Sequence, residues 1–346
     1  MKNTILVLTA LELEKTAIEF HLQDIETIFH PETNTDYAKG LFPIKGQNIE
    51  VIVGRTNQTN INAALETERA LSLFNPRYVF FAGVAGGLKD VNVGDVVIGA
   101  DVYGYERGKA EEGKFKPRPQ FGSSSYDLER FASSYAASEN WKSKSRELLD
   151  TTFAPEIKTY TGTIASGEKV DASIKSELHG FLKQNASHAL AIEMEGLGFL
   201  EVCRMRPAIK SLLLRGISDL VGDKGEMDGK GSQPYASQNV AAFLFGVVDA
   251  LITTFPEVVE ENIDQQLLEI MCKLYPGGMK DQGIWETTGG SLSLINLNQS
   301  GKGQWVEALR NMKNGGIVTF SKLLEAVLVD HPLNQDVKKL ALNVKK

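Results

Sequence analysis

The chain has 346 residues, of which 42% are hydrophobic and 23% charged, and it carries a net charge of −7 at pH 7. This length is enough for roughly two domains. The acidic balance argues against a dedicated nucleic-acid-binding protein, which usually presents a basic face. The two cysteines, Cys203 and Cys272, are far apart in the sequence, so neither a disulfide framework nor a thiolate zinc site is expected.

The sequence offers no pattern for a metal, a cofactor or a membrane segment. No two of the five histidines have HExxH-like spacing. The apolar run Ile5–Leu8 is too short for a signal peptide, and no stretch approaches the ~20 apolar residues of a membrane-spanning helix. We therefore expect a cytoplasmic protein that uses neither a metal nor another cofactor.

From residue 5 to about residue 254, short apolar runs alternate with stretches of helical spacing. Several of the apolar runs end in glycine or a carboxylate, as strands do in a sheet that helices cover on both faces. The pattern predicts an α/β domain over residues 1–255. The expected strands are 5–8, 49–54, 78–83, 95–100, 158–164, 189–192 and 209–217, and the expected helices are 12–22, 61–73, 141–149, 172–182, 195–204 and 235–253.

The composition changes after residue 255. Acidic and polar residues occupy 256–264, which is typical of a linker. Beyond it, apolar residues return at helical spacing around 267–274, 305–309 and 323–327. These patterns predict a small all-α bundle over residues 265–346, with a correspondingly thin core.

Four segments at the ends of expected strands carry the residues suited to chemistry, because ligands of α/β sheets bind where strands end and helices begin. In the first, Glu14 lies in the first turn of a helix, where an acid also complements the helix dipole. In the second, Val84, Ala85 and Gly86 belong to a glycine-rich turn whose N–H groups can face a ligand. A purely structural turn is the alternative.

The other two segments add further carboxylates. Glu193 and Glu195, separated by one residue, come directly after an apolar strand, and Asp219 closes the most apolar strand of the chain. A helix N-terminal acid and an N-cap are the alternative interpretations. Glu14, Glu195 and Asp219 would together place three carboxylates around one cleft. That set suits cleavage through an oxocarbenium-like ion, in which one acid protonates the leaving group, another activates water and negative charge stabilises the sugar.

At these residues the first ~250 positions resemble the purine nucleoside phosphorylase and methylthioadenosine/S-adenosylhomocysteine nucleosidase superfamily. The resemblance implies a nucleoside phosphorylase-like α/β fold, in which helices cover a mixed, mostly parallel sheet, and assembly into a homo-oligomer. The segments that carry it are TALELE at 9–14, GVAGGL at 83–88, VGDVV at 93–97, SGE at 166–168, EMEG at 193–196 and RGISD at 215–219.

The resemblance implies a sugar site that activates water. Glu14 resembles the family's water-activating glutamate. Met194 and Glu195 resemble the ribose contacts, with Glu195 binding the 2′ and 3′ hydroxyls. Phosphorylases generally offer a hydroxyl in the glycine segment and arginines for phosphate, whereas the corresponding position here is Val84. With Glu14 in place, we expect water rather than phosphate to be the nucleophile.

The resemblance also implies a purine site. Asp219 resembles the acid that protonates purine N7, with Ser218 and Arg215 supporting it. Val170 and Asp171 fall where the family's base-binding residues lie, without the aromatic residue that is often found there. The expected substrate is therefore a purine nucleoside or nucleotide.

The stretch expected near the 5′ end of the sugar is charged, whereas methylthioadenosine-cleaving enzymes line that end with apolar groups. Arg107 and Lys109, with Lys224 after the RGISD segment, are candidates to bind a 5′-phosphate chain. A solvated loop is the alternative, because acids are interspersed. The hypothesis is a nucleosidase that acts on a purine nucleotide, with ATP as the candidate.

Residues 267–342 resemble the effector-associated domains of bacterial conflict systems, which are small adaptor bundles. The matching features are Leu274-Tyr275-Pro276, Trp305 and the segment 330–334. The resemblance implies recruitment by an adaptor protein that carries a like domain. With a nucleotide-destroying catalytic domain, it suggests a role in defence against phage. An ordinary oligomerisation bundle is the alternative.

Two other functions are alternatives to this hypothesis. One is methylthioadenosine/S-adenosylhomocysteine nucleosidase of salvage metabolism, against which the charged stretch 101–118 argues. The other is a catalytically silent nucleotide sensor that signals through its tail. Glu14, Glu195 and Asp219 together argue against silence, because binding alone would not require three acids.

Overall fold

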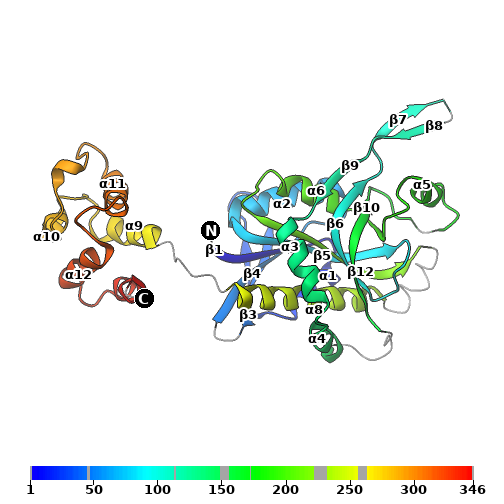
Figure 1. The fold of residues 1–346 in the computed structure, drawn as a ribbon, viewed down its shortest axis with the longest axis horizontal. Helices are drawn as coiled ribbons and strands as arrows, with labels where there is room; N and C mark the ends of the chain where they lie inside the picture. Colours follow the sequence, from blue (N-terminus) through cyan, green and yellow to red (C-terminus); the bar gives the residue numbers. More distant parts are fainter. Residues whose placement is uncertain are drawn as a thin grey trace. The chain divides into compact units, whose positions relative to one another are not determined.

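A computed structural model describes residues 2–44, 47–112, 114–148, 156–171, 173–221, 232–255 and 263–344 (Figure 1). It separates into two compact units, Met1–Thr254 and Phe255–Lys346. The first contains a sheet covered by helices and the second is helical, so the fold class expected from the sequence is confirmed. Residues 256–262 of the expected linker lie outside the described residues.

The first unit is built on a ten-stranded mixed sheet, ordered β11-β10-β6-β12-β5-β1-β4-β3-β2, with β9 beside β6. The pairs β4–β1, β1–β5, β5–β12, β6–β10 and β10–β11 are parallel. The strands are β1 (Lys2–Thr9), β2 (Gln23–Phe29), β3 (Asp36–Ile44), β4 (Gln47–Arg55), β5 (Pro76–Gly87), β6 (Val96–Gly104), β9 (Gln120–Ser123), β10 (Thr159–Ser166), β11 (Ala191–Glu193) and β12 (Lys210–Leu220).

The sheet closes on itself at the carboxyl ends of its central strands, which is where α/β sheets bind their ligands. Strand β11 pairs in parallel with β10 and antiparallel with β5, so Ile192 lies opposite Gly86. Strand β12 pairs with the other side of β5, where Asp219 also lies opposite Gly86. This closure brings the carboxyl ends of β5, β10 and β12 together with β11.

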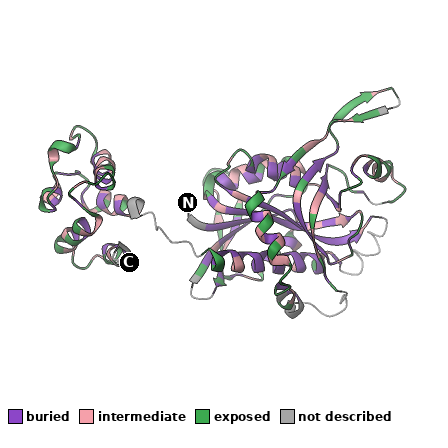
Figure 2. Ribbon diagram, in the orientation of Figure 1, coloured by how far each residue is buried: buried purple, intermediate pink, exposed green. Residues whose placement is uncertain are grey.

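Helices cover both faces of the sheet, whose strands are largely buried (Figure 2). Successive residues of β1 pack against opposite layers. Ile5 and Val7 join the core beneath α8, whereas Leu6 and Leu8 join the core beneath α2 and α6. This alternation is the expected result of period-2 side-chain placement in a strand buried on both faces. The helices are α1 (Glu12–Glu19), α2 (Asn60–Phe74), α3 (Tyr126–Ala136), α4 (Trp141–Leu148), α5 (Glu177–Asn185), α6 (Gly196–Cys203) and α8 (Ser232–Thr254).

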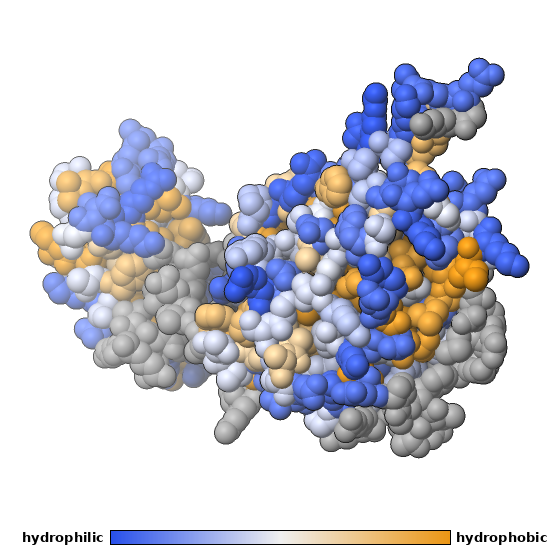
Figure 3. All heavy atoms as spheres, turned by 45° about the vertical axis from the view of Figure 1, so that its right-hand side comes forward, coloured by the Kyte–Doolittle hydropathy of each residue, from blue (hydrophilic) through white to orange (hydrophobic). Residues whose placement is uncertain are grey.

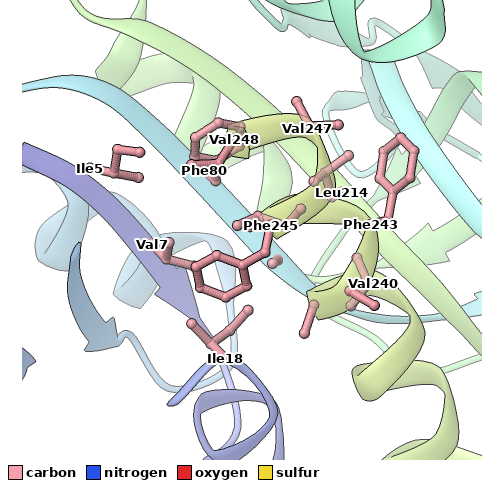
Figure 4. Close-up of a cluster of buried hydrophobic side chains, with 14 of the residues drawn as sticks. Ile5, Val7, Ile18, Phe80, Leu214, Val240, Phe243, Phe245, Val247 and Val248 are labelled. Carbon is pink, nitrogen blue, oxygen red and sulfur yellow. The ribbon is translucent and has the colours of Figure 1, made fainter. Parts of the chain in front are cut away.

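Helix α8 is the central helix of one layer, and its aromatic and branched side chains interlock with β1 and α1 (Figure 4). By length and composition alone it is apolar enough to cross a membrane, but 78% of its most apolar window is buried inside the unit. The expectation that no stretch approaches membrane-spanning length was therefore wrong for α8. Its apolar surface is explained by burial within the protein.

Elements with little buried surface were not predicted. Strand β2 is exposed along nearly its whole length, and the hairpin of β7 (Gly108–Glu111) and β8 (Lys114–Pro117) is rich in charge. Neither gives the apolar alternation that marks a half-buried strand. Strands β3 and β9 and helix α3 were also missed. The helix expected from residue 172 instead begins at Glu177, because Ser176 caps it by accepting a hydrogen bond from His179 N at 2.8 Å.

The second unit is a helical bundle around a core of buried aromatic and aliphatic side chains. Trp305 Nε1 donates to the carbonyl of Tyr275 at 3.0 Å, and the Tyr275 hydroxyl donates to Asp330 at 2.8 Å. The His331 ring lies edge-on to Tyr275 at 5.5 Å. The main helices of the second unit are α9 (Ile263–Leu274), α10 (Ile284–Thr287), α11 (Gly301–Lys313), α12 (Phe320–Asp330) and α13 (Gln335–Val344).

Phe245 tests the packing of α8. Its ring is fully buried, 4.5 Å from Phe42 and 4.7 Å from His21 between ring centroids. We expect Phe245→Ala to lower the free energy of unfolding of the first unit by about 3–5 kcal/mol in urea denaturation, through lost burial and a residual cavity. Phe20→Ala, which removes a ring that is 68% exposed, should cost less than about 0.5 kcal/mol. Equal effects of the two substitutions would contradict this packing.

Candidate active site

A cleft opens at the closed end of the sheet and gathers most of the residues that the sequence singled out. Its lining includes the three predicted catalytic acids together with the glycine-rich turn and the expected base-binding pair. The lining residues are Ala10, Leu11, Glu14, Gln58, Val84, Ala85, Gly86, Lys169, Val170, Asp171, Ile192, Glu193, Met194, Glu195, Ser218, Asp219 and Gln233.

Glu14 is a buried carboxylate held by main-chain donors. It occupies the first turn of α1, where its Oε2 accepts hydrogen bonds from Ala10 N and Leu11 N, both at 2.8 Å. Its Oε1 accepts from Val84 N, also at 2.8 Å. Burial raises the pKa of the Glu14 carboxyl above its usual range, while Arg215 acts in the opposite direction. A carboxylate with a raised pKa is a better proton acceptor near neutral pH.

Glu195 lies at the N-cap of α6 and shares a buried arginine with Glu193. Arg215 Nη2 donates to Glu195 Oε2 at 3.0 Å and forms a second ion pair with Glu193. Glu193 Oε2 also accepts from the main-chain N–H groups of Glu195 and Gly196, at 2.9 and 2.7 Å. Burial raises the pKa of Glu195 to about 7, with Arg215 lowering it and Glu193 and Glu14 raising it further.

Arg215 lies beneath the cleft rather than in it. Its side chain is fully buried and its guanidinium lies over the ring of Phe81, 4.7 Å from the centroid. An ideal Cβ on Gly83 would lie 2.2 Å from Arg215 Nη1 and 2.7 Å from Glu14 Oε1. Glycine at this position therefore lets the arginine approach Glu14. The ion pairs of Arg215 are with Glu193 and Glu195, which differs from its expected role beside Asp219.

Asp219 is the last residue of the buried part of β12 and is 2% exposed. Ser218 Oγ donates to Asp219 Oδ1 at 2.7 Å and also lies 3.4 Å from the carbonyl of Ala85. An ideal Cβ on Gly86 would stand 3.5 Å from Asp219 Oδ2. The serine thus holds the carboxyl group beside the glycine-rich turn.

The base-binding segment places Val170 at the cleft with a half-exposed side chain, whereas the Asp171 carboxylate is buried behind it. Asp171 accepts from Ser176 Oγ at 2.6 Å, and its other oxygen lies 3.3 Å from His179 Nδ1. These contacts anchor the segment to the start of α5. The described lining of the cleft contains no aromatic ring.

Two of the cations expected near the 5′ end, Arg107 and Lys109, are absent from the described lining of the cleft. Arg107 and Lys109 are exposed at the β7–β8 hairpin, which projects from the sheet and carries a mostly hydrophilic surface (Figure 3). Lys109 Nζ pairs with Glu111 at 3.0 Å on the hairpin itself. Lys224 lies outside the described residues. The nearest equivalent in the lining is Lys169, whose Nζ is 3.5 Å from Glu106.

Several lining residues were not predicted from the sequence. Gln58 and Gln233 come just before or within the first turns of α2 and α8, where no charged motif draws attention to them. Glu193 was visible as half of the EMEG pair, but its arginine partner was not. Within the described ranges, no group of three His, Cys, Asp or Glu side chains is arranged to hold a metal ion.

The fold and the site define a member of a known family. Residues 4–253 match the model of the phosphorylase superfamily, so the chain belongs to that superfamily and the resemblance drawn from the sequence is confirmed. An ATP nucleosidase of Escherichia coli (strain KTE188), Cap17, is 27% identical over 246 residues, which cover 65% of this chain and 47% of the relative. This chain therefore spans about half the length of that relative.

Other relatives share the same catalytic unit. The 5′-methylthioadenosine/S-adenosylhomocysteine nucleosidase of Bacillus subtilis (strain 168) is 28% identical over 64% of this chain and 87% of the relative. The solved structure of futalosine hydrolase from Helicobacter pylori strain 26695 matches with a TM-score of 0.57 and 26% identity, covering 71% of this chain and 97% of that one. These relatives support an N-glycosidase hydrolase activity.

The raised pKa of Glu195 makes a testable contribution to stability. Because the folded-state pKa of about 7 lies above the ordinary value of 4.5, the native state holds this proton more tightly and stability falls as pH rises through that window. The side chain of Glu195→Gln cannot ionise. Between pH 4.5 and about 7, its free energy of unfolding in urea should therefore fall less steeply than that of the wild type, and the two slopes should differ by up to about 1.4 kcal/mol per pH unit. Glu12→Gln, at an exposed carboxylate of α1, is the matched control. An unchanged slope in Glu195→Gln would contradict the assignment.

Proposed function

We propose that this chain is a purine nucleosidase that hydrolyses the N-glycosidic bond of an adenine nucleotide, with ATP as the leading candidate. The products are free base and the corresponding ribose phosphate. The observation that carries the proposal is the gathering of Glu14, Glu195 and Asp219 around one cleft. A site with three acids suits a reaction in which positive charge develops on the sugar.

The chemistry follows from the placement of the acids. As the bond between C1′ and N9 breaks, its electron pair moves into the purine and Asp219 donates a proton to N7. Glu14, whose pKa is raised by burial, accepts a proton from water as the water oxygen bonds to C1′. Glu195 binds the ribose hydroxyls and places negative charge beside the oxocarbenium-like sugar.

A nucleotide substrate is supported by the relatives and by the cleft lining. One relative is named as an ATP nucleosidase. Gln58, Gln233 and Lys169 make part of the lining polar, which suits a charged 5′ substituent better than an alkylthio group. The second candidate is methylthioadenosine/S-adenosylhomocysteine cleavage, favoured by the B. subtilis relative. A catalytically silent nucleotide sensor is the third, and the intact acid set argues against it.

The wider role belongs to the same proposal. The second unit would recruit the catalytic unit to an adaptor protein with a like domain, and nucleotide destruction would then act in anti-phage defence. Residues 1–255 form the catalytic domain, 256–264 the linker and 265–346 the adaptor domain. The chain would work in the cytoplasm as a homo-oligomer. In a pull-down, we expect the second unit to capture a protein that carries a like adaptor domain. Failure to capture any such protein would count against this role.

Asp219→Asn tests the proton donor. The amide cannot protonate N7, so kcat should fall by about 10²–10⁴-fold, whereas KM should change little because the shape of the cleft is kept. The measurement is steady-state release of free base. Asp90→Asn, which removes an exposed carboxylate, should leave kcat unchanged. Wild-type turnover in the Asp219 variant would reject this residue as the acid.

A substrate panel separates the three candidate functions. Full-length protein is incubated with ATP, AMP, adenosine, methylthioadenosine and S-adenosylhomocysteine, with and without phosphate, and free adenine is measured by chromatography. Adenine from ATP without phosphate is the expected result. Adenine only from the last two substrates would replace the proposal with salvage metabolism. Adenine from none of them, while ATP still binds, would favour the sensor.

A further inference from the structure

The turn before α2 holds an unusual backbone conformation beside the cleft. Thr59 has φ 92° and ψ 147°, a region that a β-branched residue rarely enters. In this conformation its main-chain N–H donates to Glu195 Oε1 at 3.2 Å. Its hydroxyl accepts from Asn62 N at 3.4 Å and so caps α2. The strained residue therefore links the start of α2 to Glu195.

Asn60, the next residue, ties the same turn to two other segments. Its Oδ1 accepts from Ser166 Oγ at 3.1 Å and from Gly198 N at 2.9 Å. Its Nδ2 donates to the carbonyl of Gly167 at 3.2 Å. An ideal Cβ on Gly198 would lie 1.9 Å from the Asn60 carbonyl oxygen, so glycine there allows α2 and α6 to approach closely. One amide side chain thus connects β10, the loop after it and the first turn of α6.

The result is a carboxylate held from two directions. Glu195 Oε1 faces the Thr59 amide, and Oε2 faces Arg215 at 3.0 Å. The two donors come from different elements, the turn before α2 and strand β12. Together they fix the plane of the carboxylate, and its remaining lone pairs are left for other donors.

We propose that Thr59 and Asn60 are positioning residues for Glu195, which make the site selective for a sugar that carries both ribose hydroxyls. This inference rests on the proposed function, because it takes Glu195 as the group that binds those hydroxyls. Neither Thr59 nor Asn60 lines the cleft within the described residues, so both act through Glu195. The strain at Thr59 is maintained by the Asn60 bonds on one side and the helix cap on the other.

The test compares ATP with 2′,3′-dideoxy-ATP, and adenosine with its dideoxy analogue, by kcat/KM for base release. Wild-type protein should prefer each ribose substrate by at least about 100-fold. A dideoxy substrate lacks the hydroxyls that donate to Glu195, and the buried carboxylate then has no hydrogen-bond partner in the substrate. Asn60→Ala should reduce that preference by about tenfold or more, mainly through slower cleavage of the ribose substrate. Asn185→Ala removes an amide whose bond to Phe181 stays within α5, and it should keep the wild-type preference.

Two further variants keep the proposal falsifiable if Asn60→Ala does not fold. Asn60→Asp keeps the acceptor for Ser166 and Gly198 but loses the donor to Gly167, so a partial loss of preference is expected. Thr59→Gly retains the amide and adopts the positive φ without strain, so it should stay within about twofold of wild type. Thermal melting reports folding of each variant.

The outcomes separate this inference from the function on which it rests. Equal losses on ribose and dideoxy substrates in both Asn60 variants would mean a purely structural role and overturn it. Loss of the preference in a folded Thr59→Gly protein would do the same. A wild-type chain that releases no base from any of the four substrates would refute the proposed function itself, and the positioning role with it.

Discussion

A single buried arginine organises the floor of the cleft. Arg215 is sealed from solvent, and it pairs with Glu193 and Glu195 while facing Glu14 across Gly83. Removing charges from water is unfavourable unless they are paired and hydrogen-bonded. The three glutamates therefore depend on this one cation, and the cation depends on a sheet that closes closely enough to bury it. The arrangement of the carboxylates around the cleft follows from that closure.

Much of the central fold could be predicted because its elements bury apolar surface on a regular period. The strands that became β1, β5 and β12 contain continuous apolar runs, and α2 and α8 show helical spacing. The exposed edge strand β2 and the charged β7–β8 hairpin lack such a pattern. β2 pairs with β3 and β7 pairs with β8, so each is half of a local hairpin, and the exposure of these strands leaves no apolar alternation in the sequence.

The candidate site, like the fold, could be predicted from the sequence only in part. Glu14, Glu195 and Asp219 could be singled out because charged residues directly after apolar strands are unusual. The pairing of Arg215 with Glu193 could not, because it joins residues 22 positions apart on two strands, β12 and β11, that both pair with β5 but not with each other. The predicted cations Arg107 and Lys109 show the opposite error. The charged character of this segment was recognised in the sequence, but the structure places Arg107 and Lys109 at the β7–β8 hairpin and not in the lining of the cleft.

In the second unit, two of the residues that carry the adaptor-domain resemblance, Tyr275 and Trp305, are buried in its interior. Tyr275, Trp305 and Asp330 are joined by hydrogen bonds, so the motif preserves the bundle. Large side chains such as Val329 and Leu333 stand mostly in solvent and take no part in that core. Under the adaptor role proposed above, substitutions at such exposed positions would change what the bundle recognises without disturbing how it folds. Two chains with the same buried residues would then not need to share a partner, and such tails could diversify into separate, non-cross-reacting pairs.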